Sequence, residues 1–162
     1  MEQPPDYAFK IEILDSAGKD EGSIVYNIKV TTLPNSQLWF MIKDRYSVMR
    51  SFSEDIVKPL FKDPASVLPP FPEKKFFGGS DPKFLEQRKH QLAVYFNEFF
   101  VNERILNHAR AKILEYFMES AAEDLDRVKI QKLIEQHNKG LVKMPSGDNQ
   151  LKAASSAQVI KL

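Results

Sequence analysis

The sequence predicts an α+β fold in which a three-stranded antiparallel β-meander precedes a helical subdomain of three to four helices with a proline-rich loop. Three features predict it. Apolar and polar residues alternate in three successive runs before residue 45, the apolar spacing then changes to three and four residues, and prolines cluster at residues 69–72. Alternation indicates half-buried strands, and the longer spacing indicates helices.

Each expected strand has one apolar face. Segment 15–22, which contains two glycines, and the sequence Leu33-Pro34-Asn35-Ser36 are predicted to be the turns between strands. Because these connections are short, the strands should be antiparallel neighbours. The apolar positions, run by run, are Tyr7, Phe9, Ile11 and Ile13; Ile24, Tyr26, Ile28 and Val30; and Leu38, Phe40 and Ile42.

The helical half begins after Arg45. A first helix is expected to bury Met49, Phe52, Ile56 and Leu60. Asp81-Pro82 is typical of a helix start, with proline at the first helical position. The later helices are expected at about Pro82–Phe100 and Arg104–Glu119, with a weaker helix at Glu123–Gln136.

Composition excludes several classes of protein. The chain has 162 residues, 43% of them hydrophobic, which suits one domain core with a short appendage. It has no cysteine and three histidines, so thiolate chemistry, a histidine-rich metal site and a bound cofactor are not expected. The net charge of +1 disfavours a generally basic nucleic-acid binder. No catalytic motif accompanies His90, His108 or His137, so the protein is predicted not to be an enzyme.

One arginine lies on an apolar stripe. Arg88 falls between Leu85 and Leu92 on the predicted core-facing side of the second helix. A charge in that position needs an anionic partner. Two interpretations stay open: an internal ion pair or a side chain that reaches the surface, and an anion site beside the helix.

Other cations could converge on the same anion. Lys43 and Arg45 share a face at the end of the third strand, and Lys74 and Lys75 follow the proline run. Basic side chains from several parts of a chain suit a phosphate, because charge-assisted donors favour its oxygens. The alternative for any single lysine is solvated surface charge.

Phe76-Phe77-Gly78-Gly79 adds two adjacent aromatic residues in a loop beside the two lysines. Adjacent side chains in extended backbone point in opposite directions, so both rings are not expected in one core. Aromatic rings next to basic residues suit the interface of a bilayer. A core contact by one of the rings is the alternative.

Taken in order, these motifs resemble the phox-homology (PX) domain family, best known from the sorting nexins. The resemblance covers about Tyr7 to Ser120. Arg45-Tyr46-Ser47 resembles the motif that closes the third strand, Leu68-Pro69-Pro70-Phe71-Pro72-Glu73-Lys74 resembles the proline-rich loop, and Phe84-Leu85-Glu86-Gln87-Arg88-Lys89 resembles the start of the second helix.

The resemblance implies a membrane-targeting module that binds phosphoinositides, most often phosphatidylinositol 3-phosphate. It implies that Arg45 grips the 3-phosphate, that Tyr46 packs against the inositol ring and that Lys74 contacts the 1-phosphate. Arg88 would hydrogen-bond the 4- and 5-hydroxyls, which explains its place on the stripe. The implied location is peripheral, on the cytosolic face of early endosomes, in endosomal trafficking and protein transport.

The resemblance also implies that Phe76 and Phe77 are the membrane-inserting residues. The sequence departs from the family pattern at Asp44, where a second basic residue is frequent, and at Val48 and Met49. The expected organisation is a PX-like domain at residues 1–120, a helical extension at 121–140 and a flexible tail at 141–162.

Three alternatives involve other partners. Residues 69–74 fit PxxPxK, a pattern that Src-homology-3 domains read, although a rigid wall of the lipid pocket is the competing interpretation. The helix around residues 125–134 could contact a protein partner or simply pack on the preceding helix. Nucleic acid would need stacking aromatics on an open sheet, where Trp39 and Met41 share a strand face with Lys43 and Arg45.

Overall fold

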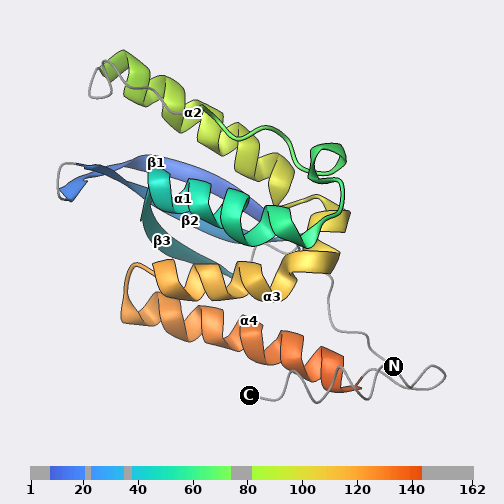
Figure 1. The fold of residues 1–162 in the computed structure, drawn as a ribbon. Helices are drawn as coiled ribbons and strands as arrows, with labels where there is room; N and C mark the ends of the chain where they lie inside the picture. The colour runs from blue at the N-terminus through green and yellow to red at the C-terminus, as the bar shows by residue number, and fades with distance from the viewer. Residues whose placement is uncertain (1–7, 21–22, 35–37, 74–81, 144–162) are drawn as a thin grey trace.

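The computed structural model describes residues 8–20, 23–34, 38–73 and 82–143. It confirms the predicted class: a three-stranded antiparallel sheet followed by helices (Figure 1). The strands are β1 (Ala8–Asp20), β2 (Ser23–Leu33) and β3 (Trp39–Arg45). The main helices are α1 (Tyr46–Ser51), α2 (Pro82–Phe99), α3 (Glu103–Ser120) and α4 (Asp124–Lys143).

The sheet order is β1-β2-β3, and the predicted apolar positions meet in register. Ile11 is opposite Val30, and Ile28 is opposite Ile42. The prediction of a turn over 15–22 was wrong for residues 15–20, which continue β1 and pair with β2 as far as Asp20 opposite Ser23. Register shifts between Ile13 and Asp15 and between Ser16 and Gly18 absorb the extra residues as bulges. The hairpin is therefore longer than alternation alone predicted.

The helices enclose an aromatic core on one face of the sheet. In Figure 1, α2 lies along β1, α1 crosses in front of the sheet, and α3 and α4 lie side by side, both in contact with β3. The ring centre of Phe9 in β1 lies 5.1 Å from that of Phe117 in α3, and the ring centre of Phe40 in β3 lies 5.3 Å from it. The phenylalanine-rich composition thus serves mainly to join the strands to the helices.

The first helix buries a different face from the one predicted. Met49 and Phe52 are buried, but Ile56 and Leu60 are exposed, and Ser53 and Val57 are buried instead. Residues Phe52–Val57 (η1) form a π-helix, which is followed by two 3-10 turns, Lys58–Leu60 (η2) and Pro64–Ser66 (η3). The i to i+5 bonds of a π-helix widen the turn and shift the buried stripe by one residue.

The free edge of β3 is closed by the start of α4. The Met41 carbonyl accepts a hydrogen bond from the Ala122 N–H at 3.0 Å, and the Met41 N–H donates to Asp126 Oδ1 at 2.9 Å. Asp126 is buried, and its second oxygen accepts from the Glu123 N–H at 3.1 Å. An edge strand exposes unpaired backbone groups, so this cover removes a site for unwanted strand pairing.

The weaker predicted helix at 123–136 is present and longer, because α4 reaches Lys143. It packs on α3 and β3. Ile130 and Leu133 are buried, whereas Leu125 and Val128 are exposed. The predicted flexible tail falls mostly on residues 144–162, which lie outside the described residues.

We predict that Asp126→Ala lowers the free energy of unfolding by about 1–3 kcal/mol, because it leaves the Met41 and Glu123 N–H groups without their acceptor. Urea denaturation measures the change. Asp124→Ala is the matched control, since it removes another acidic residue from the first turn of α4 whose side chain is fully exposed. Equal destabilisation by both substitutions would contradict the edge-closing role.

Candidate functional site

Arg88 lies between two aromatic rings. Its guanidinium carbon is 3.8 Å from the centre of the Tyr46 ring and 4.6 Å from the centre of the Phe84 ring. Phe84 precedes Arg88 by one turn of α2, so the two side chains share a face of the helix. Tyr46 comes from the start of α1. The predicted out-of-pattern arginine is thus held in a defined place by cation–π contacts.

The charge of Arg88 has no acidic partner in the described part of the chain. Its Nη2 donates to the Glu73 carbonyl at 3.3 Å, and its Nε is buried without a hydrogen-bond partner. None of the ion pairs between described residues includes it. Of the two sequence interpretations, the internal ion pair therefore receives no support, and a guanidinium with unused donors stays available for an anion or a polyol.

Tyr46 links the arginine to the proline-rich segment. Its hydroxyl donates to the Pro72 carbonyl, and its ring packs against Phe71 at 5.5 Å. Burial raises the pKa of Tyr46, while the nearby charge of Arg88 lowers it. The phenol therefore remains a neutral donor near pH 7, and it fixes residues 71–73 beside α1.

Tyr26 of β2 adds a third ring to this region. It is buried, and burial raises the pKa of its hydroxyl, although the Arg88 charge acts in the opposite direction. Arg88 is therefore close enough to influence both Tyr26 and Tyr46. The site is bounded by the sheet, α1, α2 and the end of the proline-rich segment.

Arg45 is adjacent to Tyr46 in the chain but not joined to Arg88 by any contact between described residues. It ends β3 and precedes α1 in extended backbone, with φ −94° and ψ 159°, and its side chain makes no capping bond. It is half-buried and forms no ion pair with another described residue. Its guanidinium donors are thus not used within the described structure.

Asp44, the departure from the family motif, is directed into the body of the protein. Ser120 Oγ of α3 donates to its Oδ2 at 2.6 Å, and Tyr116 is a second hydrogen-bonding neighbour. Burial raises the pKa of the Asp44 carboxyl, and these hydrogen bonds and the Arg45 charge oppose that rise. Strand alternation places the carboxylate on the opposite face of β3 from the Arg45 side chain.

We predict a stability difference between the native protein and Asp44→Asn that depends on pH. A folded-state pKa raised above 3.8 means that the folded chain holds the proton more tightly than the unfolded chain. The resulting stabilisation is complete below pH 3.8 and is lost as pH rises through the raised pKa. Urea unfolding across this range should show the native protein losing stability relative to Asp44→Asn. A constant difference, or one of opposite slope, would contradict the burial of this carboxyl.

The remaining predicted residues, Lys74, Lys75, Phe76 and Phe77, lie outside the described residues. Two features of the Arg88 surroundings were not predicted from the sequence: the contact with the Phe84 ring and the electrostatic effect on Tyr26. Phe84 could have been found from its spacing, one helical turn before the arginine. Tyr26 could not, because its approach to Arg88 depends on how α2 lies across the sheet.

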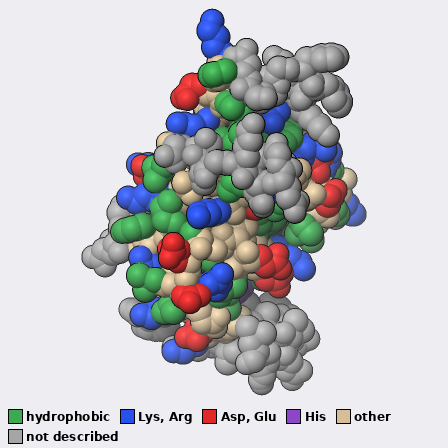
Figure 2. Space-filling model, turned by 90° about the vertical axis from the view of Figure 1, so that its left-hand side faces the viewer, with side chains coloured by type: hydrophobic (Ala, Val, Ile, Leu, Met, Phe, Trp, Pro, Cys, Tyr) green, Lys and Arg blue, Asp and Glu red, His purple; other side chains and the backbone are tan. Residues whose placement is uncertain are grey.

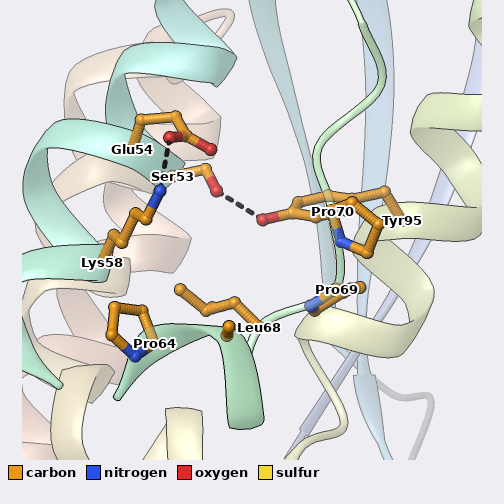
Figure 3. Close-up of a pocket in the computed structure, with 9 residues that line it drawn as sticks. Ser53, Glu54, Lys58, Pro64, Leu68, Pro69, Pro70 and Tyr95 are labelled. Atoms are coloured by element: carbon orange, nitrogen blue, oxygen red, sulfur yellow. Dashed lines mark hydrogen bonds and ion pairs between the residues drawn. The ribbon is translucent and has the colours of Figure 1, made fainter. Parts of the chain in front are cut away.

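Residues of the proline-rich segment line two hollows on the surface of the protein. One hollow of about 240 Å³ lies between η1 and this segment, where the Ser53 and Tyr95 hydroxyls are hydrogen-bonded (Figure 3). The one cation that lines it, Lys58, is paired with Glu54 at 3.2 Å. A wider hollow of about 520 Å³ lies against α2, beside Glu73 and Glu98. Neither hollow has the charge of an anion site.

Charges of both signs are interspersed with hydrophobic side chains on the face shown in Figure 2. On this face, attraction to an anion therefore depends on individual cations rather than on a large positive surface. None of the described helices is long and apolar enough to cross a membrane. In the described part of the chain, no group of acidic or histidine side chains could hold a metal ion.

The model of the PX domain family matches residues 32–121, more than half of the chain, and the chain therefore belongs to the PX domain family. PX domains are in general non-enzymatic, phosphoinositide-binding modules that target proteins to membranes. No curated protein matches the chain. Among solved structures it is similar to an X-ray structure of a designed CISK-PX domain, with 24% sequence identity, a TM-score of 0.49, and 60% of this chain and 90% of that chain covered.

Proposed function

We propose that this protein binds phosphatidylinositol 3-phosphate through the site around Arg45, Tyr46 and Arg88 and acts in endosomal trafficking. It would act as a peripheral protein on the cytosolic face of early endosomes. The observation that carries the proposal is Arg88: a half-buried guanidinium between two rings, with a buried Nε that has no partner. A polar ligand with several oxygens would satisfy such a group.

Each of these side chains would contact a different part of the headgroup. Arg45, whose donors are unused among the described residues, would bind the 3-phosphate, since a guanidinium can bind phosphate in a bidentate manner. Arg88 would bind the 4- and 5-hydroxyls, which disfavours lipids phosphorylated there. Lys74 would contact the 1-phosphate.

The position of Arg88 on the Tyr46 ring restricts how the headgroup can bind. The Tyr46 ring would pack against the inositol ring, but Arg88 lies 3.8 Å above one face of it. A headgroup that stacks on that face must move the guanidinium aside and replace a contact of about 0.5–2 kcal/mol. Hydrogen bonds from Arg88 to the sugar hydroxyls offset that cost. Modest affinity for the headgroup alone is therefore expected, with additional binding from the membrane.

We predict that vesicles containing phosphatidylinositol 3-phosphate sediment the protein more strongly than phosphatidylserine vesicles. Arg45→Ala and Arg88→Ala should each weaken this binding by roughly ten- to a hundredfold, because each removes charge-assisted hydrogen bonds of about 1.5–3 kcal/mol. Arg104→Ala, an exposed arginine at the start of α3, is the matched control and should leave binding unchanged. Equal binding to both vesicles would reject the proposed ligand.

We predict a different result for the loop residues Phe76 and Phe77, which we propose insert into the bilayer. The double substitution Phe76→Ser with Phe77→Ser should weaken vesicle binding by roughly tenfold, since it removes apolar area from the membrane contact. Binding of soluble inositol 1,3-bisphosphate, measured by calorimetry, should stay the same. A parallel loss in both assays would show that the rings support the pocket instead.

A further inference from the structure

The sheet has a second face, directed away from the aromatic core, and one tryptophan stands out on it. Trp39 begins β3 and its side chain is 43% exposed. Strand alternation places it on the same face as Met41, Lys43 and Arg45. A large aromatic side chain that stays exposed is typical of interfaces rather than of ordinary surface.

Two lysines from different elements hold the Trp39 ring. Lys29 Nζ of β2 lies 4.9 Å from the ring centre, and Lys129 Nζ of α4 lies 4.3 Å from it. Lys129 Nζ also donates to the Trp39 carbonyl at 3.0 Å. Neither lysine belongs to an ion pair between described residues. The ring is thus ordered, and two ammonium groups beside it have no carboxylate partner among those residues.

The start of α4 extends this surface with exposed apolar side chains. Leu125 and Val128 are 65% and 52% exposed, the largest values among the exposed large hydrophobic residues that the structure describes. Leu125 lies one helical turn before Lys129, on the side of α4 that faces Trp39. The Asp126–Met41 bond holds these turns against β3. We call Trp39, Lys29, Lys129 and Leu125 the Trp39 patch.

The surroundings of the Trp39 patch are basic on the sheet side. Among outward-facing strand residues with described side chains, Lys10, Lys29, Lys43 and Arg45 are cationic and Glu12 is anionic. Glu12 of β1 is opposite Lys29 in the register of β1 and β2, and its carboxylate lies 4.0 Å from Lys10 Nζ. Apolar side chains beside an excess of cations complement a partner that carries carboxylates around an apolar residue.

We propose that the Trp39 patch binds an acidic peptide segment of a partner protein. An apolar side chain of the peptide would lie on Trp39 and Leu125, and flanking carboxylates would pair with Lys29 and Lys129. Since the ring and the lysines are already in place, little side-chain freedom is lost on binding. This inference goes beyond the proposed lipid binding, and it uses residues of β2 and α4 outside the family match at 32–121.

Two other anionic partners fit the patch less well. Trp39 and Arg45 are at opposite ends of β3, about 20 Å apart at the usual rise of a strand. A single headgroup bound at the Arg45–Arg88 end would therefore not reach Trp39. Nucleic acid would need several stacking rings, and Trp39 is the single exposed aromatic ring on the described open face. Because the exposed carboxylates of Glu123 and Asp124 lie beside Leu125, the acidic residues of the peptide would be directed toward the lysines of the sheet rather than toward the start of α4.

The chain has one tryptophan, so its fluorescence reports directly on the patch. A random peptide display library would be selected on the full chain, with excess soluble Trp39→Ala chain as competitor. The recovered peptides should be rich in aspartate and glutamate around an apolar residue, and they should change the Trp39 emission on titration. Lys129→Glu should weaken their binding at least about tenfold. The control Lys62→Glu, at an exposed position between η2 and η3, should change it less than about twofold.

Several results would overturn the proposal. Recovered peptides without an acidic bias, or peptides that bind Trp39→Ala equally well, would remove the basis for an acidic ligand. A shift of the Trp39 emission by phosphatidylserine vesicles, with no response to the peptides, would assign the patch to the membrane. Self-association that Trp39→Ala abolishes would assign it to a second copy of the chain. Arg88→Ala serves as a reference, because it should impair lipid binding and leave peptide binding intact.

Discussion

The junction between β3 and α1 directs three consecutive side chains to three parts of the protein. Asp44 faces α3, where Ser120 and Tyr116 bind its carboxylate. Arg45 faces the open side of the sheet, and Tyr46 turns to the proline-rich segment and Arg88. This divergence follows from the change of period from strand to helix at Arg45. The proposed lipid site, the core and the open face of the sheet all depend on it.

Tyr46 and Arg88 stabilise each other and also define how the site can work. The hydroxyl of Tyr46 fixes the Pro72 carbonyl, and Arg88 binds the next carbonyl, that of Glu73. Residues 71–73 are thereby anchored to both α1 and α2, and they directly precede Lys74, which we propose contacts the headgroup. A ligand that displaces Arg88 from the Tyr46 ring would therefore also act on the segment that holds these residues.

The fourth helix does more than extend the domain. Its first turn closes the edge of β3 through Asp126, and the same docking brings Lys129 to Trp39. Edge protection and the Trp39 patch are therefore products of one contact between α4 and β3. A buried aspartate with both oxygens bonded to backbone N–H groups fixes this contact in one register.

Local rules determined much of this protein from its sequence alone. Alternation identified the strands, Pro82 marked the start of α2, and the apolar stripe of α2 singled out Arg88. The tertiary structure decided what pairwise packing controls: the π-helical shift that exposes Ile56, the continuation of β1 through residue 20, and the aromatic rings around Arg88. Periodicity reports which face of an element is apolar, but it contains no information on which distant residue meets that face. For that reason the sequence indicated an arginine that needed a partner. Only the packing of α2 against α1 showed that its neighbours are Tyr46 and Phe84 rather than an acid.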